Sequence, residues 1–172
     1  MERIFVEKRH KVCGKLKGMV IKMSSICGAD CNNCGFGRHN GCRGCAESEG
    51  CPFGKQCFIA EYIKTGGKDN FELLKKQLIE EFNSLKIPGM PKINELFPLN
   101  GAFINLDYPL FNGYSVKFLD DNDIYLGNQV ECEFNNGDLI RCYGLAANMD
   151  FLLISEFGPN GSNPEIILYK KR

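Results

Sequence analysis

The sequence has no tryptophan, only two histidines, and no apolar run long enough to cross a bilayer, which takes about 20 residues. His10 and His39 are the only histidines, so the sequence offers few candidates for a catalytic Cys–His pair oriented by a third group. No phosphate-binding loop or dinucleotide fingerprint is present either. These absences count against a membrane protein and favour a protein that is not an enzyme.

The chain also lacks an excess of charge, because 21 Lys and Arg balance 21 Asp and Glu. This neutrality counts against nucleic acid or an anionic membrane as a partner and leaves a protein or small-molecule partner as the expectation. Basic residues gather only in the first 22 positions, so we interpret residues 1–23 as a basic extension. This extension is either a solvated arm or a segment added by a start codon upstream of the true one, for which Met19 and Met23 are candidates. No apolar segment typical of a secretory signal follows it, so we expect a cytoplasmic protein.

Cysteine, in contrast, is abundant: seven of the ten cysteines fall within residues 27–57. The seven are Cys27, Cys31, Cys34, Cys42, Cys45, Cys51 and Cys57. Glycine fills the gaps between them and large apolar residues are scarce, so the segment cannot close on a hydrophobic core of its own. Because cytoplasmic cysteines rarely form stable disulfides, clustered thiols there indicate metal binding.

Two Cys-x-x-Cys pairs, Cys31/Cys34 and Cys42/Cys45, carry the strongest signal. Each pair can supply two of the four thiolates that a tetrahedral zinc ion takes, and a short gap separates the pairs. His39 lies in that gap and is an alternative to one thiolate. The sequence therefore predicts a structural zinc site with these four cysteines as principal ligands.

Three further cysteines of the segment, Cys27, Cys51 and Cys57, are either substitute ligands or a second set. Cys27, Cys31 and Cys34 share the spacing that radical-SAM enzymes use for a four-iron cluster, but the chain is too short for their barrel. An iron–sulfur cluster in a redox or sensor protein stays open as the alternative to zinc, because four thiolates suffice for it.

The motif Ile-Cys-Gly-Ala-Asp-Cys-Asn-Asn-Cys at 26–34 is followed by Gly-Cys-Arg-Gly-Cys at 41–45 and by Cys57 before a helix. This pattern resembles a bacterial cysteine-rich family of unknown function over residues 24 to about 64. The resemblance implies a metal-binding protein without an agreed activity. Members often have further cysteines after the helix start, and residues 59–85 of this chain have none.

Beyond the cysteines, two helices are predicted. Apolar residues at 58–63 share one helical face, and Gly66-Gly67 indicates the end of this first helix. Asp69 or Asn70 then caps a second helix over 69–86, with a 3.6-residue apolar stripe. That stripe consists of Phe71, Leu74, Leu78 and Phe82, joined by Leu73, Ile79 and Leu85.

After Pro98, turn residues recur between short β-rich runs, which is typical of antiparallel strands. The expected strands are 102–107, 113–119, 123–128, 129–135, 139–145, 149–156 and 165–170. We therefore predict an α+β fold: a Cys-rich metal-binding N-terminal module with two helices, then a C-terminal antiparallel β meander or small barrel. The predicted domains are residues 24–87 and 98–172.

One hairpin of this β half allows a register to be predicted. If the turn at Asn136-Gly137 has three residues, Cys132 faces Cys142 and Glu133 faces Arg141, which pairs opposite charges. A two-residue turn places Cys132 opposite Arg141 and Glu131 opposite Cys142 instead. We prefer the first register, in which the two cysteines are small buried side chains, a redox pair or extra metal ligands.

Overall fold

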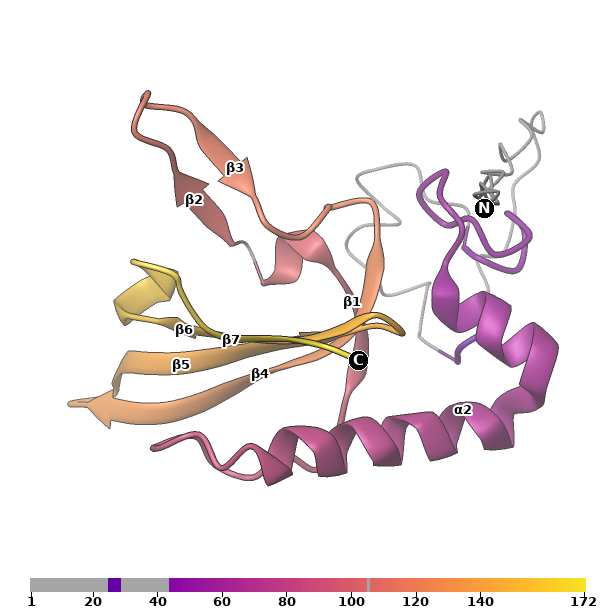
Figure 1. Ribbon diagram of the computed structural model, residues 1–172, viewed down its shortest axis with the longest axis horizontal. Coiled ribbons are helices and arrows are strands. Elements are labelled where there is room, and N and C mark those ends of the chain that lie inside the picture. The colour runs from indigo at the N-terminus through magenta and orange to yellow at the C-terminus, as the bar shows by residue number, and fades with distance from the viewer. Residues whose placement is uncertain (1–24, 29–43, 105) are drawn as a thin grey trace, which may run out of the picture.

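The structure is a computed structural model that describes residues 25–28, 44–104 and 106–172. These residues contain one α-helix, α2 (Phe58–Ser84), and two antiparallel β-structures. The strands are β1 (Phe97–Asn100), β2 (Asp107–Pro109), β3 (Ser115–Lys117), β4 (Ile124–Asn135), β5 (Asp138–Ala147), β6 (Phe151–Phe157) and β7 (Glu165–Lys171). Five of them form a sheet in the order β1-β4-β5-β6-β7, while β2 and β3 form a separate ribbon that projects from it (Figure 1).

The predicted fold class is wrong, because the described residues hold one helix where two were expected. The Gly66-Gly67 dipeptide does not divide this segment into two separate helices: α2 spans it with a kink at Gly67, whose φ of 81° and ψ of 170° are non-helical. Glycine tolerates this backbone conformation, so the helix bends at Gly67 instead of stopping (Figure 1). Asp69 and Asn70, the expected caps, consequently lie inside α2. The β half is an open five-stranded sheet, not a barrel.

Helix α2 packs along one face of the sheet through the apolar stripe that the sequence predicts. Phe71, Leu74, Leu78 and Phe82 are buried in one core with sheet residues such as Leu145. Beyond the bend, the first turns of the helix bury their own apolar residues in this same core. The helix therefore joins the cysteine-bearing loop before it to the sheet.

Alternation along the strands gives the sheet a second buried face. Leu145 and Ile154 are paired across β5 and β6 and point towards α2, whereas their neighbours Ala146 and Leu153 belong to a separate apolar cluster. Residues between β1 and β4 cover this second face, among them Leu106. The sheet is thus covered on both faces by parts of the same chain.

The strand bounds differ from the prediction where the chain leaves β1. Residues 101–103 form a short 3-10 helix in place of the start of the strand predicted at 102–107. Gly101 sits so close to the backbone of Asp120 that an added Cβ would lie 2.4 Å from that carbonyl oxygen. The two strands predicted at 123–128 and 129–135 are the single strand β4.

The hairpin of β4 and β5 has a mixed register. Asn136 and Gly137 have φ values of 51° and 87° and form a two-residue turn, typical of tight hairpins. Register shifts then let Glu133 pair with Arg141, as predicted, while Cys142 lies opposite Glu131. The prediction that Cys132 faces Cys142 is wrong, because the turn has two residues instead of the preferred three, and this register places Glu131 opposite Cys142.

No helix among the described residues is long and apolar enough to cross a membrane.

Candidate metal centre

The described part of the cysteine-rich segment is the loop 44–57, which leads into α2, together with residues 25–28. Short backbone hydrogen bonds hold the loop: Gly50 N–H donates to the Cys45 carbonyl at 2.6 Å, and Cys57 N–H donates to the Gly50 carbonyl at 2.8 Å. Gly50 has φ 93°, a conformation that favours glycine. The loop is therefore a series of tight turns that places its cysteines without regular secondary structure.

Cys27 and Cys45 meet although they are distant in the sequence. Their side chains hydrogen-bond to each other, and the backbone N–H of Ile26 donates to Cys45 Sγ at 2.8 Å. The backbone of Cys27 and of Cys45 itself also favours the charged form of this sulfur and lowers its pKa. Cys45 is buried, with 6% of its surface exposed, so these donors replace the water that a sulfur anion would otherwise need.

This environment changes the acidity of the thiols. The hydrogen bond from Cys27 and the backbone N–H groups lower the pKa of Cys45 to about 6, against the opposing effect of burial. Hydrogen bonds to a thiolate favour the charged form, which is the form that binds metal. Burial has the dominant effect on Cys57, the residue before α2, and raises the pKa of its thiol.

The two remaining cysteines of the loop differ in role. Cys57 is buried and belongs to the core that α2 shares with the sheet, although the charge of Cys45 still influences its thiol. Cys51 is also buried and is disulfide-bonded, whereas Cys27, Cys45 and Cys57 are thiols. A sulfur in a disulfide is not a thiolate ligand, so Cys51 can bind metal only after reduction.

Several predicted ligands lie outside the described residues: Cys31, Cys34, Cys42 and the alternative His39, as does the basic extension 1–23. Within residues 25–28, 44–104 and 106–172, no three Cys, His, Asp or Glu side chains form a group that could hold a metal ion. The described residues therefore supply one pair of adjacent thiols. Both members of this pair are thiols, which are ligands that zinc takes, and an N–H donor stabilises the charged form of one of them. Two further thiolates would complete a tetrahedral set.

The contact between Cys27 and Cys45 was not predicted from the sequence. The Cys-x-x-Cys spacing is a local signal that groups Cys45 with Cys42, and it leaves Cys27 as a substitute ligand. No spacing rule links two cysteines across a long loop, so only the tertiary structure could show this pair.

An ion-pair cluster ties the cysteine loop to the sheet half of the molecule. Lys55 Nζ contacts the carboxylate of Asp120 and lies 3.6 Å from Asp123 Oδ2. The two carboxylates raise the pKa of Lys55, and Lys55 in turn lowers the pKa of Asp120. These side chains are nearly half exposed, so solvent screens the pair and its contribution to stability is small.

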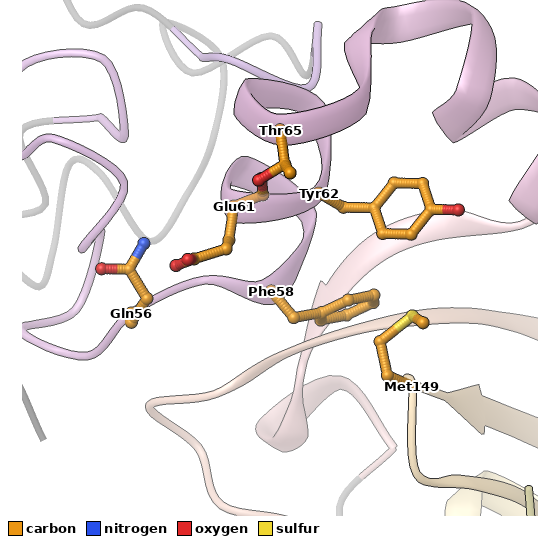
Figure 2. A pocket seen from close by; sticks show the side chains of 6 residues that line it. All are labelled: Gln56, Phe58, Glu61, Tyr62, Thr65 and Met149. Carbon is orange, nitrogen blue, oxygen red and sulfur yellow. The ribbon is translucent and has the colours of Figure 1, made fainter. Parts of the chain in front are cut away.

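A shallow pocket of about 390 Å³ opens where the loop meets α2 (Figure 2). It is lined by Gln56, Phe58, Glu61, Tyr62, Thr65 and Met149. Figure 2 shows Met149 reaching from the turn between β5 and β6 towards Phe58 and Tyr62, while Gln56 and Glu61 lie on the other side. The pocket adjoins the cysteine loop but contains no cysteine.

No protein-family model, curated protein or solved structure matches the sequence. The resemblance to the bacterial cysteine-rich family therefore stays a prediction.

Proposed function

We propose that this chain is a metal-binding protein whose cysteine-rich module holds zinc as a structural ion. The observation that supports the proposal is the contact between Cys27 and Cys45, with the backbone N–H of Ile26 donating to the Cys45 sulfur. Such donors stabilise a thiolate in a site where water is largely excluded. The role that follows is binding or regulation, with no chemistry at the metal.

The ligand set is proposed to combine this pair with thiolates of the neighbouring segment. Zinc takes four ligands, and the sequence offers Cys31, Cys34 and Cys42 between the two described ones. The contact with Cys45 makes Cys27 a stronger candidate than its sequence position alone suggests. Cys57 is a weaker one, because it is buried in the helix–sheet core.

The first test is the metal content of protein purified without air and without chelator. We expect about one zinc per chain, no visible absorption band and no acid-labile sulfide. Iron with sulfide would replace this proposal by the iron–sulfur redox or sensor protein. Absence of both metals would contradict metal binding altogether.

A second test uses cysteine variants with a matched control. Cys34→Ala should lower the zinc content and abolish most of the hydrogen-exchange protection of residues 44–57, because metal binding in such modules is folding energy. Cys142→Ala removes a thiol on β5 and should leave zinc content unchanged. Equal zinc content and equal exchange in all three proteins would contradict the proposal.

A further inference from the structure

The first turns of α2 present a row of side chains to the pocket beside the cysteine loop. Phe58, Glu61, Tyr62 and Thr65 follow one another at i, i+3, i+4 and i+7, so they share one face of the helix. Met149 lies across from this row, on the turn between β5 and β6 (Figure 2). The pocket is therefore formed by helical spacing together with the packing of α2 on the sheet.

One end of the pocket is apolar and held in place by the core. Phe58 and Tyr62 are half-buried and pack against the core that α2 shares with the sheet. Met149 is 44% exposed, and Figure 2 shows its thioether on the side of these two rings. Aromatic rings and a thioether are surfaces on which an apolar group binds. The volume of about 390 Å³ is within the range of small-molecule sites.

The other end of the pocket carries a negative charge. Glu61 is the one charged residue among the six that line the pocket, and Gln56 lies beside it (Figure 2). None of the ion pairs formed by the described residues includes Glu61. Glu61 belongs to the first turn of α2, where its charge exceeds the partial positive charge of the helix end. The polar end of the pocket therefore attracts a cation.

We propose that this pocket binds a small organic amine, with the apolar body of the amine against Phe58, Tyr62 and Met149 and its ammonium group at Glu61. An amine is protonated at neutral pH, so it pairs with the carboxylate, whereas an acid of the same shape is repelled. Glu61 is exposed to water, so the ion pair adds about a two- to fivefold preference over a neutral ligand. No cysteine lines the pocket, so this site does not require the proposed zinc.

The experiment titrates the full chain with three probes of one shape: phenylbutylamine, phenylbutanol and phenylbutyrate. Isotope-labelled methionine methyl groups are followed by NMR, because the chain has five methionines and Met149 is the one that lines the pocket. The Met149→Ala variant identifies the signal of Met149 by its loss. We expect a saturable shift of this signal, with the amine binding most tightly, the alcohol two- to fivefold more weakly and the acid weakest.

Three outcomes of this titration would overturn the proposal. The first is the lack of a saturable shift up to the solubility limit of the amine. The second is a saturable shift of other methionine signals that leaves the Met149 signal unchanged, because the amine then binds elsewhere. The third is equal affinity for the amine and the alcohol, because the pocket then recognises only the apolar body.

A pair of charge variants tests the role of the carboxylate. Glu61→Gln removes the charge and keeps the shape, so it should lower the affinity for the amine about two- to fivefold and leave the affinity for the alcohol unchanged. Glu80→Gln is the matched control, because it removes the same charge from an exposed position of α2 outside the pocket. An unchanged affinity for the amine in Glu61→Gln, or an equal loss in Glu80→Gln, would overturn the pairing with Glu61.

Discussion

The cysteine loop 44–57 and the helix–sheet half of the molecule are held together by different forces. The loop is made of tight turns, short backbone hydrogen bonds and sulfur contacts such as that of Cys45. The helix–sheet half buries large apolar side chains on both faces of the sheet, with Leu78 and Leu145 fully inaccessible. Loss of a proposed metal ligand should therefore affect the loop, while loss of apolar contact should affect the whole molecule.

The loop and the helix–sheet half contact each other through a few residues. These residues determine how much a substitution in one region destabilises the other. Cys57 closes the loop and already belongs to the apolar core, and Lys55 reaches across to Asp120. The bend at Gly67 divides α2 into a part next to the loop and a part along the sheet. Each of these contacts offers a substitution that tests the comparison.

The largest effect is expected from the apolar core. Leu78→Ala removes a fully buried side chain from the face of α2 that packs on the sheet and should lower the free energy of unfolding by about 2–5 kcal/mol. Leu73→Ala is the matched control, because Leu73 lies on the same helix with 54% of its surface exposed, contrary to its predicted place in the stripe. Denaturant unfolding measures both, and losses of equal size would contradict this assignment of the core.

An intermediate effect is expected at the helix bend. Gly67→Ala forces a residue with a Cβ into φ 81° and ψ 170°, which should cost about 1–3 kcal/mol in the free energy of unfolding. Gly66→Ala is the control: the side chain of Asn70 must move slightly, and the helix gains from the exchange of glycine for alanine. Thermal unfolding of both variants checks the result. A neutral Gly67→Ala would show that the helix does not bend there.

The smallest effect is expected at the junction. Lys55→Met breaks the ion pairs with Asp120 and Asp123 and should cost about 0.2–1 kcal/mol, because solvent screens these half-exposed groups. Lys92→Met removes the same charge from a lysine that forms none of the described ion pairs, and it is the control. Unfolding in low and high salt measures the difference between the two, which should shrink as salt rises.

The same pair has a pH dependence with a definite sign. Lys55 lowers the pKa of Asp120 in the folded chain, so the pair stabilises the fold above the ordinary carboxyl pKa. This contribution is lost as the pH falls through the lowered pKa of Asp120. Lys55→Met should therefore lose less stability than the unaltered chain on acidification, and parallel acid titrations of the two would contradict the assignment.

Local sequence signals predicted parts of the structure that depend on neighbouring residues. The apolar stripe from Phe71 to Phe82 is buried along α2, and Asn136-Gly137 turns the chain between two strands. Glu133 pairs with Arg141 across that hairpin. Each of these predictions depends on a signal within a few residues: a 3.6-residue period, a turn dipeptide or a charge pair. None of them required knowledge of a contact between distant residues.

Other features were predicted wrongly or missed because a distant contact decided them. Gly67 bends the helix instead of ending it, since the apolar residues on both sides of the bend are buried in one core. Cys142 faces Glu131 for a different reason: the turn has two residues and not three, and the two register shifts around Glu133 cancel before that pair. The contact of Cys27 with Cys45 has no local signal at all.

The sequence by itself determined the chemistry that this chain has available. It concentrates thiols in one glycine-rich segment that cannot build a core, and it distributes apolar stripes through the rest. Only the tertiary structure decided which thiols meet, because the packing of residues 25–28 against the loop 44–57 brings Ile26 and Cys27 to Cys45. Composition and spacing act along the chain, whereas the protonation and reactivity of a sulfur depend on what surrounds it in space.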